Sequence, residues 1–149
     1  MRNNILKPIA TLFGLGYIPV MPGTFASATG LLLYLLIGRH ANLYFAVTVI
    51  AVILGFYASD KARIFFAKDD PRQIVIDELC GILITYLFIP FKASNIIIGF
   101  ILFRTWDILK IYPLKRLERL RGGWGIMLDD IAAALIANGI LQVLNRVSF

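Results

Sequence analysis

Apolar residues occur along this chain in long blocks that short polar stretches separate. The clearest block spans residues 41–58 (ANLYFAVTVIAVILGFYA), and the others span 23–37, 79–91, 93–103 and 126–144. The blocks lack the alternation of a β-barrel strand, which argues against that architecture. They are typical of helices in a membrane, where one straight span takes ~20 residues. The pattern therefore predicts an all-α fold, a small integral membrane helical bundle with about four or five membrane segments.

Two stretches depart from this simple pattern. Residues 3–18 contain glycines and are expected to lie at the membrane interface or to dip into it. Block 79–91 is short for a straight span, so we expect either a tilted span or one arm of a helical hairpin. The sequence contains no internal repeat or low-complexity tract, and its length predicts a single domain over residues 1–149.

Composition supports a membrane protein and narrows its chemistry. Hydrophobic residues make up 59% of the 149 residues, whereas ordinary soluble domains contain ~45–50%. The chain has one cysteine and one histidine, so a bound metal would have mainly oxygen ligands, which Mg²⁺, Mn²⁺ and Ca²⁺ prefer. The net charge is +6, and the basic residues lie beside apolar blocks. We therefore expect the bilayer and anionic lipid as partners, and not nucleic acid.

The charged residues are sorted along the chain. The nine acids fall within residues 60–78, within 104–121, or at the start of the last apolar block. If the five blocks cross a membrane in turn, these three places share one face. The opposite face then has no acid and carries Arg39, His40, Lys92 and Arg146. The other twelve Lys and Arg residues lie on the acid-bearing face, which the positive-inside rule makes cytoplasmic.

Carboxylates lie at the edges of three apolar stretches. Asp129 and Asp130 lie a few residues inside the last block, where an acid that only caps a helix would be costly. Asp77 and Glu78 open block 79–91, and Asp107 follows block 93–103. Adjacent helical residues point ~100° apart, so one member of the 129–130 pair can bind a metal while the other holds a neighbouring group, or each can serve its own centre. We expect these carboxylates to gather around a divalent cation, with helix capping as the alternative for one of the pair.

Basic and glycine-rich stretches supply groups that suit an anion. Arg104 and Lys110 flank Asp107 at i−3 and i+3, roughly along one helix stripe, and can hold phosphate oxygens. The turn at Gly123 precedes a helix, so its backbone N–H groups can approach an anion, although a flexible loop explains the glycines equally well. Thr24 follows a Pro-Gly turn and is either a phosphate contact or simply the N-cap of the next helix.

Divalent metal, phosphate-binding bases and a membrane edge together indicate phosphoryl chemistry on a lipid head group. The main alternative is a cation or proton transporter that uses membrane-edge carboxylates, although the sites of transporters typically lie near the bilayer midplane. A membrane scaffold without catalysis is a third class. A phosphatidyltransferase is closer in chemistry, but the sequence lacks the spaced D-G…A-R…G…D…D signature of the common alcohol transferases.

Four stretches of the chain follow a known order of motifs. They are PGT at 22–24, DPRQIVIDELCG at 70–81, RTWDILKIYP at 104–113 and GGWGIMLDDIAAA at 122–134. In this order they resemble the phosphatidylglycerophosphatase A family, and the resemblance runs from about Leu12 to Leu141. The chain departs from the family pattern at Ile111, Ala134 and Ala26, where backbone geometry and not charge is affected.

The resemblance implies Mg²⁺-dependent hydrolysis of phosphatidylglycerol phosphate in bacterial phospholipid synthesis, on the cytoplasmic side of the inner membrane. It implies that the catalytic residues are Asp77, Glu78, Asp107, Asp129 and Asp130. Four of these are expected to hold Mg²⁺, namely Asp77, Glu78, Asp129 and Asp130. The expected phosphate contacts are Arg104, Lys110, Thr24 and Gly123, while Asp70 matches with a turn or cap role equally open. The family also has soluble all-helical relatives, so some apolar blocks can instead pack as a core.

Overall fold

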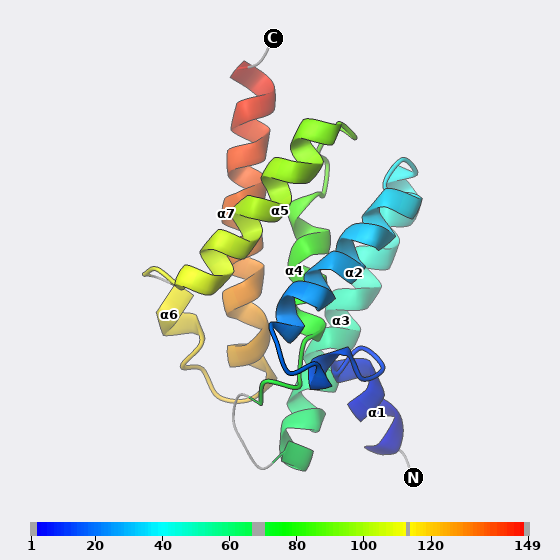
Figure 1. Cartoon of the computed structure of the whole chain (residues 1–149), viewed down its shortest axis with the longest axis vertical. Coiled ribbons are helices and arrows are strands. Elements are labelled where there is room, and N and C mark those ends of the chain that lie inside the picture. The colour runs from blue at the N-terminus through cyan, green and yellow to red at the C-terminus, as the bar shows by residue number, and fades with distance from the viewer. Residues whose placement is uncertain (1–2, 67–70, 113, 148–149) are drawn as a thin grey trace.

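The computed structural model describes residues 3–66, 71–112 and 114–147, and every regular element in these ranges is a helix. Figure 1 shows α1 (Asn3–Ala10), the 3-10 helix η1 (Leu15–Tyr17), α2 (Pro22–Ile37), α3 (Ala41–Phe66), α4 (Ile76–Thr85), α5 (Ala93–Leu109), α6 (Leu114–Leu117) and α7 (Gly123–Val147). The all-α prediction is confirmed.

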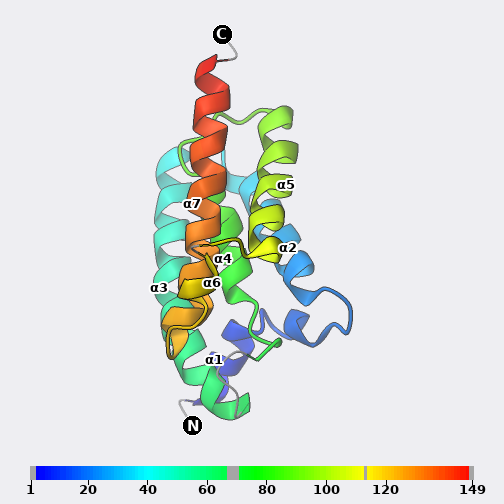
Figure 2. The same ribbon diagram turned by 90° about the vertical axis from the view of Figure 1, so that its left-hand side faces the viewer.

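The long helices run along the bundle, and their connections lie at two ends (Figures 1 and 2). We call the end that holds α1, α6 and the first turn of α4 the lower end, and the end that holds the α2–α3 turn and the start of α5 the upper end. Helix α4 lies between the others and packs against α2, α3, α5 and α7. All its residues from Leu79 to Thr85 are buried, so α4 is the core helix whose first turn faces the lower end.

The apolar blocks correspond to helices whose ends are shifted. Block 41–58 extends to Phe66 as α3, because its polar continuation stays helical, and block 126–144 lies within α7. Block 79–91 is helical only as far as Thr85, and the chain then continues through turns to α5, which runs back towards the lower end (Figure 1). This arrangement agrees with the expectation of one arm of a helical hairpin. Residues 3–18 form α1 and η1 and not one continuous segment.

Two helices of the described ranges are long and apolar enough to cross a membrane, Ala41–Lys61 within α3 and the whole of α7. Helix α2 is apolar but shorter, at 16 residues. Large apolar side chains such as Leu36, Ile53, Ile101 and Leu135 are exposed on the outside of the bundle. Exposed apolar surface on this scale marks contact with lipid or another partner. The two apolar helices and this surface indicate a membrane-associated protein.

Candidate active site

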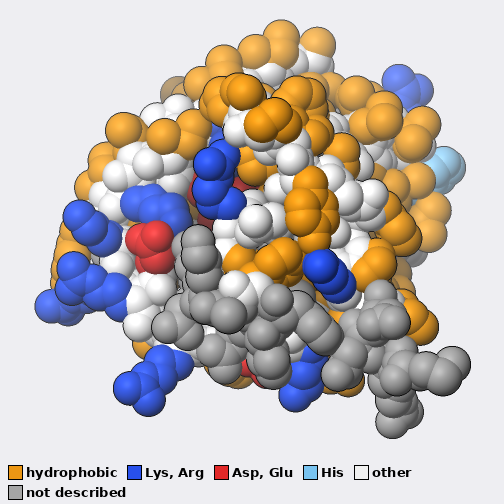
Figure 3. Space-filling view, turned by 60° about the horizontal axis from the view of Figure 1, so that its bottom comes forward, with side chains coloured by type: hydrophobic (Ala, Val, Ile, Leu, Met, Phe, Trp, Pro, Cys, Tyr) orange, Lys and Arg blue, Asp and Glu red, His pale blue; other side chains and the backbone are white. Residues whose placement is uncertain are grey.

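One cavity at the lower end collects the predicted site residues. It has a volume of about 370 Å³, and its walls come from the loop before α2 with the first turn of that helix, the segment that leads into α4 with its first turn, the end of α5 and the first half of α7. In Figure 3 basic side chains lie around the few acidic ones that are visible at this end, and apolar side chains cover much of the remaining described surface. The charged lining residues are Arg72, Asp77, Glu78, Arg104, Asp107, Lys110, Asp129 and Asp130. We call this space the acid cavity.

Three carboxylates form a cluster in the acid cavity. Asp77 and Glu78 lie in the first turn of α4 and Asp130 in α7, and one oxygen from each lies within 4.8 Å of the other two. Each of the three also has a buried oxygen without a hydrogen-bond partner in the described part of the chain: Asp77 Oδ1, Glu78 Oε2 and Asp130 Oδ2. Clustered carboxylate oxygens that lack hydrogen-bond partners are suitable ligands for a divalent cation such as Mg²⁺.

Arg104 is held next to this cluster by groups from two helices. Its Nη1 donates to Asp107 Oδ2 and, at 3.3 Å, to Ser27 Oγ, while its Nη2 donates to Thr24 Oγ1 at 3.2 Å. Arg104 Nε is buried and has no hydrogen-bond partner among the residues that the structure describes. An oriented guanidinium with an unused N–H group is suited to bind an oxyanion that enters the cavity.

Lys110 is held in the same way by carboxylates. It follows the last residue of α5 in the left-handed conformation, with φ of 43°, and its Nζ donates to Asp129 Oδ2 at 2.8 Å and to Glu118 Oε1 at 3.1 Å. Burial lowers the pKa of Lys110, but the hydrogen bond and the charge of Asp129 outweigh this effect and raise the pKa above its usual value. Lys110 therefore remains a cation. Asp129 thus binds Lys110 while Asp130 joins the cluster, as the ~100° between adjacent helical residues requires.

The first turn of α2 approaches the cluster closely. Helix α2 begins at Pro22 after Met21, whose φ is 49°, so Thr24 lies inside the helix and the prediction that Thr24 is the N-cap is wrong. Proline is favoured in the first turn because it has no N–H to lose there. A Cβ atom at Gly23 would collide with the carboxylate of Glu78. Gly23 therefore lets α2 approach Glu78, a role that the sequence did not reveal beyond its Pro-Gly turn.

Two further predicted residues lie elsewhere. The backbone N–H of Gly123 donates to Asp60 Oδ1 at 3.3 Å, and Gly123 lines a separate cavity of about 360 Å³ beside Trp124. The structure therefore does not bring Gly123 to the acid cavity. Asp70 lies outside the described residues. Conversely, Arg72 lines the acid cavity without any sequence signal except its place in a motif stretch.

The fold and the site together define a class: helical, membrane-associated proteins with an acidic pocket that suits a cation and a phosphate group. The chain matches the family phosphatidylglycerophosphatase A over residues 8–145 and belongs to this family, whose members are phosphatases. It is 34% identical to phosphatidylglycerophosphatase A of Escherichia coli K12 over 93% of this chain and 82% of that protein.

Two other relatives are similarly close. The chain is 36% identical to phosphatidylglycerophosphatase A of Haemophilus influenzae Rd, over 91% of each protein. It is 34% identical to a putative phosphatidylinositol-3-phosphatase of Bacteroides thetaiotaomicron, over 91% of this chain and 90% of that protein. No solved structure matches the chain.

Proposed function

We propose that this protein hydrolyses the terminal phosphomonoester of phosphatidylglycerol phosphate to give phosphatidylglycerol and inorganic phosphate. The observation that carries the proposal is the presence, in one cavity, of unpaired carboxylate oxygens and the unpaired Arg104 Nε, within the part of the chain that is described. The carboxylates suit a cation and the guanidinium suits a phosphate. The names of the relatives from E. coli and H. influenzae indicate the substrate. These names give no support to the transport alternative.

Each group in the acid cavity has a distinct task in this reaction. Asp77, Glu78 and Asp130 would hold Mg²⁺, which when bound polarises the phosphoryl group and favours attack by water. Arg104 Nε and Lys110 Nζ bind oxygens of the phosphomonoester, and their carboxylate partners fix both bases in position. Overall, the oxygen of water bonds to phosphorus, the ester P–O bond breaks, and the released glycerol hydroxyl takes up a proton.

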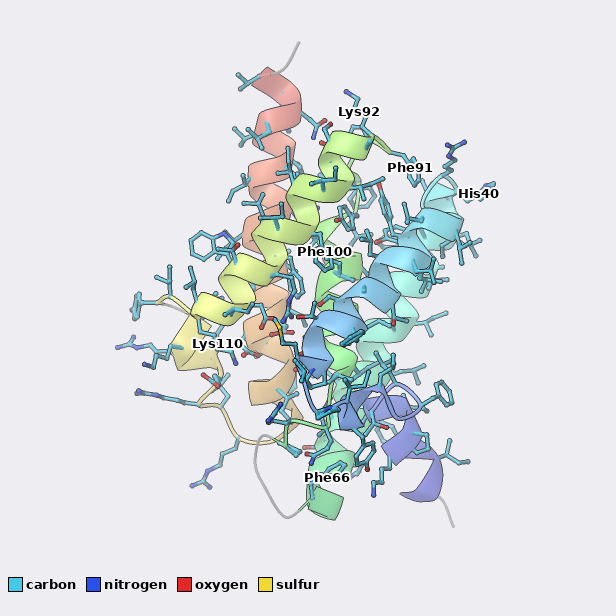
Figure 4. All side chains as sticks on the ribbon, viewed as in Figure 1. His40, Phe66, Phe91, Lys92, Phe100 and Lys110 are labelled. Carbon is cyan, nitrogen blue, oxygen red and sulfur yellow. The ribbon has the colours of Figure 1, made fainter. Side chains whose placement is uncertain are left out.

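The proposed setting is the bacterial inner membrane, with about four or five segments across it and the lower end at the cytoplasm. The segments would be α2, α3, α4 with the chain that follows it, α5 and α7. The distribution of charge supports this topology, because His40 and Lys92 lie at the upper end in Figure 4 and Lys110 lies towards the lower end. The five acids that line the acid cavity lie at the lower end of the bundle, where a cytoplasmic head group would be.

An apolar groove suggests where the acyl chains of the substrate lie. This groove of about 410 Å³ runs along α5 and is lined by Phe100, Ile101, Arg104, Thr105, Ile108 and Leu109. Arg104 and Ile108 also line the acid cavity, so the groove and the cavity adjoin each other. A lipid can therefore place its head group in the cavity while its chains remain against apolar surface.

The first test is phosphate release from phosphatidylglycerol phosphate by purified protein in detergent, with Mg²⁺ and with EDTA. We expect release with Mg²⁺ and none after chelation. A second readout that does not need substrate is the melting temperature, which Mg²⁺ should raise in the wild type because a ligand of the folded state stabilises it. The Asp130→Asn variant should show a much smaller rise. Folded protein that releases no phosphate in either condition would contradict the proposed function.

A further inference from the structure

Arg72 differs from the other two cations that line the acid cavity. Arg104 is engaged by Asp107, and Lys110 by Asp129 and Glu118. Arg72 has no carboxylate partner among the described residues, and its Nη2 donates a hydrogen bond of 3.3 Å to the backbone oxygen of Pro19. Within the described part of the chain, most of its five N–H donors therefore have no partner and can bind a ligand.

Arg72 is also more exposed to solvent than the other two cations of the acid cavity. The side chain of Arg104 is only 13% exposed and that of Lys110 is 31% exposed, whereas Arg72 is an exposed residue. The acid cavity thus has a buried cation beside the carboxylate cluster and an exposed cation at its rim. Its contact with Pro19 places Arg72 against the loop that leads into α2, on the wall that also contains Met21 and Gly23.

The proposed substrate has two phosphates with different roles. Phosphatidylglycerol phosphate carries a terminal phosphomonoester, which is hydrolysed, and a phosphodiester, which joins the glycerol head group to the diacylglycerol. A phosphomonoester bound among Arg104, Lys110 and the clustered carboxylates leaves the phosphodiester, one glycerol unit away, to lie closer to the rim of the cavity. The guanidinium of Arg72, which has no carboxylate partner among the described residues, is well suited to bind such a phosphate, because its planar fork matches two phosphate oxygens.

We propose that Arg72 binds the phosphodiester of the substrate and so makes the site selective for lipids that carry both a phosphodiester and a phosphomonoester. This inference rests on the proposed function and extends it from the reacting phosphate to substrate choice. Phosphatidic acid, which has a phosphomonoester but no phosphodiester, lacks the group that Arg72 recognises. Arg72 is then a specificity residue that takes no part in breaking the P–O bond.

A purely structural role for Arg72 makes a different prediction. If its bond to Pro19 only holds the loop before α2 in place, loss of Arg72 should disturb the cavity for every substrate equally. Direct binding of the phosphodiester should instead change the ratio between substrates. The ratio of kcat/KM for phosphatidylglycerol phosphate to that for phosphatidic acid therefore separates the two roles.

The experiment compares Arg72→Gln with Arg119→Gln, which removes the same charge from another exposed residue that does not line the acid cavity. Both substrates carry the same acyl chains and are presented in uncharged mixed micelles with Mg²⁺. We expect Arg72→Gln to lower the substrate ratio about tenfold, mainly through KM for phosphatidylglycerol phosphate, as for loss of one charge-assisted contact. Arg119→Gln should leave the ratio unchanged, and Arg72→Lys, which keeps the charge, should lower it about threefold or less.

A second readout does not depend on turnover of phosphatidic acid. Phosphatidylglycerol has the phosphodiester alone, so its inhibition constant reports binding at Arg72, and Arg72→Gln should raise this constant about tenfold. An unchanged substrate ratio and inhibition constant in folded Arg72→Gln protein would overturn the inference, as would an equal loss on both substrates. Wild-type protein that releases no phosphate from phosphatidylglycerol phosphate would instead overturn the proposed function itself.

Discussion

Two of the buried polar side chains of helix α7, Asp130 and Asn138, lie about two turns apart, and their surroundings differ sharply. Asn138 is 8% exposed, and its Nδ2 donates to the backbone oxygens of Thr85 at 3.0 Å and Leu87 at 2.8 Å, where α4 ends. Asp130 is 3% exposed, and its Oδ2 has no partner in the described residues although it lies beside two other carboxylates. Burial is similar at the two sites, so burial alone does not distinguish them.

The comparison distinguishes a buried polar residue that stabilises the fold from one that serves the functional site. A buried polar group that is fully bonded costs little and fixes the geometry around it, which is how Asn138 ties the end of α4 to α7. A buried carboxylate without a partner is costly, and it is retained where a ligand completes its bonding. The side chain of Asn138 is thus bonded within the folded chain, whereas we propose that a cation completes the bonding of Asp130. The predictions that follow test this contrast by changing one region at a time.

The largest effect is expected for Asp130→Asn. The amide removes one charge from the cluster with almost no change in shape, so we expect phosphate release to fall by about 10³-fold or more, equivalent to ~4 kcal/mol. The melting temperature without metal should stay the same or rise, because repulsion among the carboxylates decreases. The matched control is Asp60→Asn, since Asp60 binds the backbone of Gly123 outside the acid cavity, and it should keep activity within about threefold. Near-wild-type activity of Asp130→Asn would remove Asp130 from the catalytic set.

The opposite pattern is expected for Asn138→Ala. The substitution leaves the carbonyl oxygens of Thr85 and Leu87 without their side-chain donor, which should cost ~1–3 kcal/mol of stability. Thermal unfolding in detergent should show a melting temperature lower by several degrees. Activity measured well below that temperature should stay within about twofold of the wild type, because the acid cavity is unchanged. A large loss of activity without loss of stability would mean that Asn138 belongs to the functional region after all.

Sequence patterns predicted those features of the fold that depend on neighbours in the chain. The block at 41–58 predicted a helix because its apolar run is continuous, and the acids of the site were found because each lies at the edge of such a run. Helix geometry alone predicted that Asp129 and Asp130 point in different directions, but it did not assign the contacts of each. These inferences need no knowledge of how the helices pack.

The remaining features depend on contacts between distant segments. Asp60 on α3 accepts a hydrogen bond from the backbone N–H of Gly123 on α7, and no local sequence pattern reveals this pairing. Arg72 looks like an ordinary surface residue until the loop of Pro19 is placed beside it. At the end of α4, the backbone oxygen of Thr85 likewise accepts a hydrogen bond from Asn138, which lies about fifty residues further along the chain. Sequence thus identified most of the acid cavity but not which of its groups are already paired.

The smallest effect is expected for Gly23→Ala, which changes the geometry of the cluster but not its charge. The added Cβ would meet the Glu78 carboxylate, so Glu78 must shift, and we expect kcat/KM to fall about tenfold, or ~1.4 kcal/mol. The control is Gly139→Ala on α7, where an added Cβ meets nothing within 4 Å. It should raise stability by ~0.5–1 kcal/mol, as alanine does in a helix, and leave activity unchanged. If Gly23→Ala retains full activity, the position of Glu78 does not limit the reaction, and the cluster functions through its charge without a fixed arrangement of its oxygens.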